Sequence, residues 1–194
     1  MRRAVFLDRD GVLNKLVVRD GRAVSPLALA EFVLLPGVRR AVEALRDASL
    51  LAVVVTNQPD VARGALGANE LRRMHERLRR AVPVDAIYTC PHDDPDGCAC
   101  RKPKPGLLLR AAEERQISLK DSWLVGDSWK DIEAGKAAAC TTFLVDPLGL
   151  EPARGAPDFV VPSLSAAVRA ILQEFHRAGS PKPGKSLFFQ GGAS

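Results

Sequence analysis

The stretch that decides the fold of this 194-residue chain is Ala4-Val5-Phe6-Leu7-Asp8-Arg9-Asp10-Gly11-Val12. Four apolar residues run directly into two carboxylates one residue apart, which is typical of a buried strand whose carboxyl end opens onto a site. In an open α/β sheet, ligands bind outside the carboxyl ends of the strands, so chemistry is expected here. A second interpretation is that Asp8 and Asp10 only cap a turn, in which Gly11 takes a positive φ.

The rest of the chain alternates predicted strands with predicted helices. Further buried strands are expected at 50–55, 84–89, 122–125, 141–145 and 159–161, and amphipathic helices at 38–48, 69–82, 104–116, 131–139 and 164–175. Alternation of this length predicts an α/β fold with a doubly wound, mostly parallel sheet in one domain over residues 1–178. Residues 12–35 lack periodicity and are expected to form a loop or small flap over the site, in place of a large cap domain. Residues 179–194 are expected to form a flexible tail, part of which can be an expression remnant.

Composition limits the location and the partners of the chain. Lys and Arg outnumber Asp and Glu by 28 to 23, an excess that suits an anionic substrate as well as it suits nucleic acid. No run approaches the ~20 apolar residues of a membrane span. Asp8, Asp10 and Asn14 stand where a secretory signal would be apolar. We therefore expect a cytoplasmic monomer that does not bind membranes.

Three of the four cysteines cluster with a histidine, in the pairs Cys90-Pro91-His92 and Cys98-Ala99-Cys100. Each pair places two soft ligands on one side of an extended segment, and only five residues separate the pairs, so a tetrahedral zinc site is predicted. With all four positions filled by protein, this zinc is expected to be structural. A disulfide from Cys90 to Cys98 or Cys100 is the competing interpretation, but it leaves His92 unexplained. The isolated His75 is interpreted as a surface or core histidine, not as a ligand.

Four stretches of the chain resemble the four motifs of the haloacid dehalogenase-like (HAD-like) phosphatases. In chain order they are Asp8-Arg9-Asp10-Gly11-Val12, Thr56-Asn57-Gln58, Lys102-Pro103 and Gly126-Asp127-Ser128-Trp129-Lys130-Asp131. The cysteine loop and the Arg101-Lys102-Pro103 that follows it resemble those of the D,D-heptose 1,7-bisphosphate phosphatases and the related histidinol-phosphate phosphatases. The resemblance covers residues 4–162, which is most of the chain.

The resemblance implies a catalytic role for four residues. Asp8 would be the nucleophile that becomes an aspartyl phosphate, and Asp10 the general acid and base. Lys102 would add positive charge beside Asp8, and Thr56 a hydrogen bond to the phosphoryl group. Family precedent also places a catalytic Mg²⁺ on Asp8, on the backbone carbonyl of Asp10 and on Asp127, with Asp131 beside these ligands.

The implied reaction is the Mg²⁺-dependent hydrolysis of a small phosphorylated sugar, with removal of the 7-phosphate of D-glycero-D-manno-heptose 1,7-bisphosphate as the leading candidate. Substrate would be bound by the catalytic residues and by five others: Arg9, Asn57, Gln58, Arg101 and Ser128. Pro59-Asp60 stands where the family usually has Ser-Gly, and a carboxylate there is expected to retune selectivity. One alternative is hydrolysis of histidinol phosphate. An alternative of another class is a basic zinc protein that binds nucleic acid, but few aromatic residues are available to stack on bases. No nucleic-acid partner is therefore expected.

Overall fold

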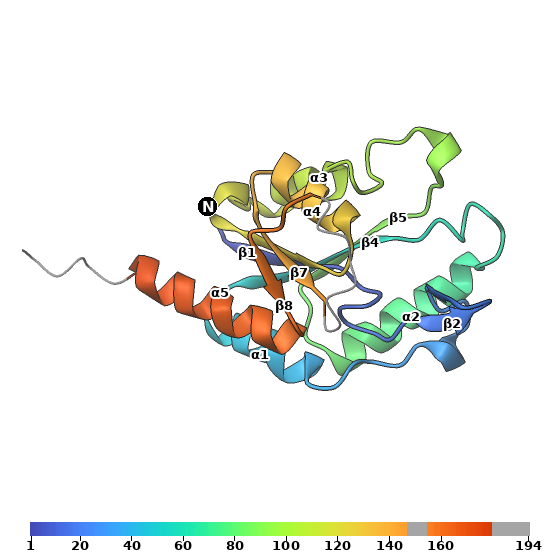
Figure 1. Cartoon of the computed structure of the whole chain (residues 1–194), viewed down its shortest axis with the longest axis horizontal. Helices are drawn as coiled ribbons and strands as arrows, with labels where there is room; N and C mark the ends of the chain where they lie inside the picture. The colour runs from blue at the N-terminus through green and yellow to red at the C-terminus, as the bar shows by residue number, and fades with distance from the viewer. Residues whose placement is uncertain (147–154, 180–194) are drawn as a thin grey trace, which may run out of the picture.

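A six-stranded sheet forms the centre of the computed structural model, which describes residues 1–146 and 155–179 (Figure 1). The strand order is β5-β4-β1-β6-β7-β8, and every neighbouring pair is parallel. The strands are β1 (Ala4–Leu7), β4 (Leu51–Asn57), β5 (Ala86–Cys90), β6 (Trp123–Gly126), β7 (Thr141–Val145) and β8 (Phe159–Val161). The predicted doubly wound parallel sheet is confirmed.

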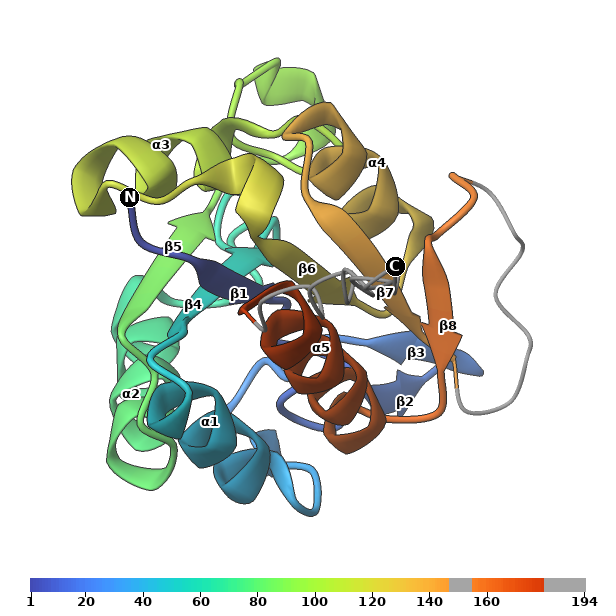
Figure 2. The same ribbon diagram turned by 90° about the vertical axis from the view of Figure 1, so that its left-hand side faces the viewer.

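Helices cover both faces of the sheet (Figure 2). One face carries α1 (Val38–Asp47), α2 (Ala68–Ala81) and α5 (Leu164–Gly179), and the other carries α3 (Gly106–Arg115) and α4 (Trp129–Ala137). Each face has its own hydrophobic core. In β1 the side chains alternate between these cores, since Val5 and Leu7 lie in the first and Ala4 and Phe6 in the second. This double burial explains why β1 is an uninterrupted apolar run.

A two-stranded antiparallel hairpin, β2 (Val17–Arg19) and β3 (Arg22–Val24), lies within the predicted loop over residues 12–35. Its turn is Asp20-Gly21, where both residues have positive φ, as a tight hairpin turn requires. The predicted loop or small flap thus contains a regular hairpin that the prediction did not include, although an Asp-Gly pair between two short β-prone segments is a hairpin signal. Three single-turn 3₁₀ helices complete the described elements, at Leu29–Glu31, Asp94–Asp96 and Leu119–Asp121.

The carboxyl ends of four adjacent strands meet at one edge of the sheet, opposite the N-terminus of the chain (Figure 1). Asp8 follows β1, residues 56–58 lie at the end of β4, the cysteine loop follows β5, and Asp127 follows β6. The parallel topology therefore brings all four predicted motifs together.

Two further predictions concern the ends of the chain and membranes. Within residues 1–146 and 155–179, no helix is long and apolar enough to cross a bilayer. The predicted tail, residues 179–194, lies outside the described residues except for Gly179, which ends α5.

Candidate active site

A buried lysine joins two carboxylates at the centre of the candidate site. Lys102 Nζ lies 2.9 Å from Asp8 Oδ1, also pairs with Asp131, and donates to the backbone carbonyl of Val55 at 3.0 Å. Burial lowers the pKa of Lys102, but the charges of Asp131 and Asp8 outweigh this effect and the pKa is raised. Lys102 is therefore a permanent cation at the end of β1.

Asp127 adds a third carboxylate to this centre. Asp8, Asp127 and Asp131 each offer an oxygen, and these three atoms lie within 4.8 Å of one another. Burial raises the pKa of Asp8 to about 7, although the charge of Lys102 opposes this shift. Burial and the charge of Asp8 also raise the pKa of Asp127. Such carboxylates need a cation in order to remain charged together.

The backbone of the first motif approaches Asp127 closely. A Cβ atom built on Gly11, whose φ is +79°, would lie 1.9 Å from Asp127 Oδ2. Only glycine fits this position, both for its backbone conformation and for the space available. The turn after β1 and the acid after β6 thus form a cradle of hard oxygen atoms, and this donor set fits Mg²⁺.

A cavity of about 400 Å³ opens onto this centre. Asp8, Asp10, Lys102 and Asp127 line its floor, whereas Asp131 does not reach it. The flap predicted over residues 12–35 is confirmed as a wall of the site, because side chains on and beside the hairpin line the cavity too: Leu16, Ala23, Val24 and Ser25.

Two predicted substrate-binding residues turn away from the cavity. The side chain of Arg9 is fully buried and bonds to Asp10, and Gln58, 1% exposed, donates to Asp10 Oδ2 at 2.8 Å and to Thr56 Oγ1 at 3.0 Å. Neither side chain lines the cavity. Both side chains are used here in binding the Asp10 carboxylate, and their contact with substrate stays a prediction.

Of the other predicted substrate-binding residues, some line the cavity and others are buried. Asn57 lines the cavity and holds the backbone of Lys102 through bonds of 3.0 and 3.1 Å. Ser128 also lines it, and its hydroxyl donates to Asp131 Oδ2 at 2.8 Å at the start of α4. Thr56 is buried at 1% exposure, beneath the lining.

A second cavity of about 610 Å³ adjoins the first and is rich in cations. The two cavities share Val24, Ser25, Pro59, Arg101 and Lys130, and Arg19, Arg22, Asp60 and Arg63 belong to the second alone. Arg101 is already engaged, because its Nε donates to Asp94 at 2.6 Å and its Nη1 to the backbone carbonyl of His92 at 3.4 Å. Arg101 therefore reaches both cavities from a fixed position.

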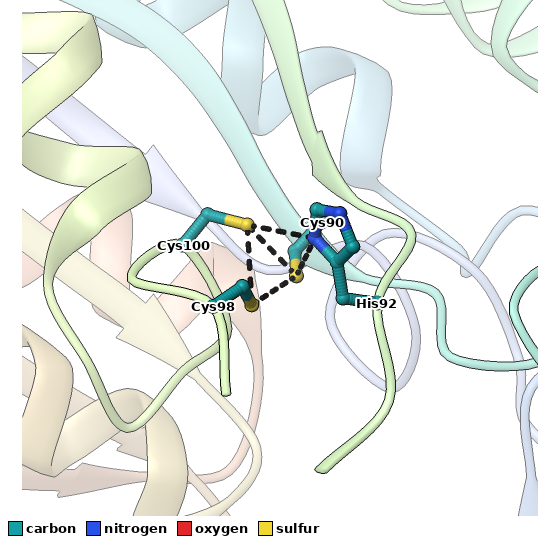
Figure 3. Close-up of side chains that lie close together, drawn as sticks. All are labelled: Cys90, His92, Cys98 and Cys100. Carbon is teal, nitrogen blue, oxygen red and sulfur yellow. Dashed lines mark hydrogen bonds between the residues drawn. The ribbon is translucent and has the colours of Figure 1, made fainter. Parts of the chain in front are cut away.

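The four predicted zinc ligands come together in one cluster (Figure 3). The Sγ atoms of Cys90, Cys98 and Cys100 and the Nδ1 atom of His92 are 3.1 to 3.7 Å from their neighbours. With Zn–S bonds of about 2.3 Å, the edge of a tetrahedral site is about 3.8 Å, so the donor set and spacing fit zinc. The thiols are free, and sulfurs this far apart do not form the alternative disulfide, whose S–S bond is about 2.05 Å.

Comparisons with known proteins identify the family. A curated D-glycero-beta-D-manno-heptose-1,7-bisphosphate 7-phosphatase of Bordetella bronchiseptica is 39% identical over 146 residues, which are 73% of this chain and 79% of that protein. The phosphatase of the same name from Yersinia pestis is 35% identical over 89% of this chain and 96% of its own length. The chain belongs to this family of heptose-bisphosphate phosphatases. A HAD-hydrolase-like family model also matches residues 99–167.

Solved structures of the heptose-bisphosphate phosphatase family agree with the fold. The D,D-heptose 1,7-bisphosphate phosphatase of B. bronchiseptica, solved with magnesium and phosphate, superposes with a TM-score of 0.76 and 34% identity, covering 89% of this chain and 99% of that one. The phosphatase from Burkholderia thailandensis gives a TM-score of 0.62 at 27% identity. The small hairpin and the cysteine loop therefore stand in a HAD-like fold, and residues 1–146 and 155–179 contain no large cap domain.

Three residues that bond to the predicted site residues were not identified as such from the sequence. Asn14 donates to Asp10 Oδ1 at 2.8 Å, and Asp94 pairs with Arg101. His75 is buried, as one of the two interpretations had it, but it contacts Arg9 Nη1 at 3.3 Å. Asn14 lies close enough to the first motif to be suspected, whereas no sequence signal links His75 to Arg9.

Proposed function

We propose that this protein is a Mg²⁺-dependent phosphomonoesterase that works through an aspartyl phosphate on Asp8. The supporting observation is the environment of Asp8. Two carboxylates bind Lys102, but Asp131 has only 1% of its side chain exposed, whereas Asp8 has 13% exposed and lines the cavity. Asp8 is thus the lysine-bound carboxylate that a phosphate ester in the cavity can reach.

The reaction then follows in two steps. Asp8 attacks phosphorus, the bond from phosphorus to the ester oxygen breaks, and the leaving oxygen takes a proton from Asp10. In the second step Asp10 takes a proton from water as that water attacks the aspartyl phosphate, which releases inorganic phosphate and restores Asp8. Lys102 neutralises charge on Asp8 and on the transferring group, and the Thr56 hydroxyl is proposed to donate to the same group.

We assign the two metals from their donor sets. Asp8, Asp127 and the backbone carbonyl of Asp10 would hold Mg²⁺, with Asp131 beside them on Lys102. When bound, this ion supplies charge neutralisation for the phosphoryl oxygens. The cysteine cluster would hold one structural Zn²⁺ through Cys90, His92, Cys98 and Cys100, and so brace the loop that carries Arg101 and Lys102.

The proposed substrate is D-glycero-D-manno-heptose 1,7-bisphosphate, hydrolysed at its 7-phosphate. Two observations support it: relatives of that name share 35–42% identity with this chain, and the cation-rich second cavity adjoins the first. A sugar with its 7-phosphate on Asp8 would extend its other phosphate toward Arg22, Lys130 and Arg101. Histidinol phosphate carries a cation, which would pair with the carboxylate of Asp60 in the same cavity.

A substrate panel tests this assignment. We expect kcat/KM for the heptose bisphosphate to exceed that for histidinol phosphate by at least ~10-fold, or ~1.4 kcal/mol of transition-state binding. Phosphorus NMR identifies the phosphate that leaves. Arg101→Ala is expected to lower the ratio of kcat/KM for the heptose bisphosphate to kcat/KM for histidinol phosphate. Arg110→Ala serves as the control, because Arg110 is an exposed, ion-paired arginine on α3 away from both cavities. A preference for histidinol phosphate, or release of the 1-phosphate first, would reject the heptose assignment and leave the phosphatase standing.

Four further expectations belong to this proposal. A zinc site made of thiolates suits a reducing compartment, so we place the protein in the cytoplasm. Residues 1–178 are proposed to form one domain and to act as a monomer without a nucleic-acid partner. Size-exclusion chromatography with light scattering tests the monomer, limited proteolysis tests the single domain, and a salt-dependent gel shift tests the absence of a nucleic-acid partner.

A further inference from the structure

Arg9 is a fully buried charge beside the proposed acid and base of the reaction. Its guanidinium spans both oxygens of Asp10, with Nε and Nη2 at 3.1 and 3.0 Å from Oδ1 and Nη2 at 2.9 Å from Oδ2. Nη2 also donates to Gln58 Oε1 at 2.9 Å, and the guanidinium carbon lies 5.5 Å from the centre of the Phe32 ring. Because burying a guanidinium is costly without such partners, these contacts fix both Arg9 and Asp10 in one arrangement.

The Asp10 carboxyl group is held from several sides. Oδ1 accepts from Arg9 and from Asn14, and Oδ2 accepts from Arg9 and from Gln58. Asp10 nevertheless lines the same cavity as Asp8, with 8% of its side chain exposed. Proton transfer to a leaving oxygen depends on the direction of the carboxyl plane, so the residues that fix this plane bear on the rate.

His75 holds the far side of Arg9. It comes from α2, 66 residues away in the sequence, and its Nε2 lies 3.3 Å from Arg9 Nη1. Burial, with the charges of Arg9 and Arg79, lowers the pKa of His75 to about 4, so the ring is neutral at physiological pH and Nε2 accepts the hydrogen bond. The contacts thus run from His75 through Arg9 to Asp10, and His75 itself does not line the cavity.

We propose that Arg9 and His75 are positioning residues for proton transfer: His75 fixes the guanidinium of Arg9, and Arg9 fixes the carboxyl plane of Asp10 toward the leaving oxygen. This inference rests on the proposed function, in which Asp10 protonates that oxygen. It assigns a role in the reaction to a histidine on a distant helix, and it gives Arg9 a role other than the predicted substrate contact.

The test compares two esters that differ in their need for a proton. A sugar phosphate releases an alkoxide, which must be protonated, whereas p-nitrophenyl phosphate releases a stable phenolate, which need not be. The ratio of kcat/KM for the two esters reports the step in which the leaving group departs. A change that only loosens the fold affects both esters alike and leaves the ratio unchanged.

His75→Leu removes the hydrogen-bond acceptor and puts an apolar side chain in its place. We expect it to lower kcat/KM for the sugar phosphate by about 10- to 100-fold, which is a part of the 10²–10⁴-fold typical of general acid catalysis. The kcat/KM for p-nitrophenyl phosphate is expected to change by less than about threefold. His75→Gln, whose amide oxygen can accept from Arg9, is expected to restore most of the loss. Arg9→Lys, which keeps the charge but loses the planar fork, should shift the ratio in the same direction as His75→Leu.

Leu78→Ala on the same helix is the matched control, because Leu78 is fully buried in the core next to α2 but has no polar link to Arg9. It is expected to lower the melting temperature and leave the ratio unchanged. A wild-type protein that hydrolyses neither ester overturns the proposed function itself. If the wild type is active and the folded His75→Leu variant has kcat/KM lowered equally for both esters, or for neither, this inference alone is overturned.

Discussion

Replacing Lys102 by Met tests the charge balance of the site most directly. Methionine has a similar length and fills the same space, but it leaves Asp8 and Asp131 without their buried cation. Removing one partner of a buried ion pair costs about 3–5 kcal/mol. In a chain of this size, 1 kcal/mol shifts the melting temperature by about 2–4 °C, so we expect a loss of roughly 6–20 °C at pH 8 without added Mg²⁺.

The size of this loss depends on pH. Lys102 lowers the pKa of Asp8, so its removal raises that pKa further above the value of about 7 in the intact site. At pH 5.5 Asp8 then takes up a proton and no longer needs a cation. The destabilisation by Lys102→Met is therefore expected to be largest at pH 8 and smaller at pH 5.5.

Calorimetry at both pH values measures the stability, and turnover in Mg²⁺ measures catalysis, which should fall by about 10²-fold or more. Lys104→Met is the control. Lys104 is exposed, and the described contacts of its Nζ are two hydrogen bonds to the backbone carbonyls of Gly97 and Cys98, so we expect a change within about 0.5 kcal/mol. An equal loss at both pH values, or an unchanged kcat, would refute the reasoning about Lys102.

Three other outcomes are expected. Asp8→Asn keeps the shape of the nucleophile but not its charge, so turnover should fall by several orders of magnitude in a phosphate-release assay, and near-normal turnover would exclude the aspartyl phosphate. Purified, reduced protein should contain about one zinc per chain by metal analysis, and Cys98→Ser should lose both the zinc and thermal stability. Because the pKa of Asp8 is about 7 in the folded chain and 3.8 in an ordinary carboxyl group, the protein without Mg²⁺ should gain stability as the pH falls from 8 toward 5. Mg²⁺ should accordingly raise the melting temperature more at pH 8 than at pH 5.5, and the opposite order would show that it binds elsewhere.

The sheet and its helices were predictable because the burial of each element determines its pattern of apolar residues. A strand such as 51–55, covered on both faces, is an unbroken apolar run, and a helix such as α1 alternates apolar and charged faces at helical spacing. The hairpin at 17–24 escaped prediction because its strands have three residues each and no fully buried face. Its Asp20-Gly21 turn was the only strong signal it carried.

The composition of the site followed from the motifs, but the direction of each side chain did not. The first motif places Asp8, Arg9 and Asp10 together, yet the tight turn at Gly11 decides which of them faces the cavity and which faces the core. The family resemblance implied that Arg9 and Gln58 contact substrate. In the structure the same donors bind Asp10, since a buried carboxylate competes for them as effectively as a phosphate would.

The distribution of charge supports the proposed metal site once these pairings are made. Four carboxylates meet at this edge of the sheet, and the described residues provide two buried cations: Lys102 for Asp8 and Asp131, and Arg9 for Asp10. Asp127 is left without an ion pair among those residues, and burial together with the charge of Asp8 raises its pKa. The centre is thus two positive charges short before any phosphate enters, which is the charge of one divalent cation. A bound phosphate adds further negative charge, so Mg²⁺ held by Asp8 and Asp127 would neutralise both the site and the group that it transfers.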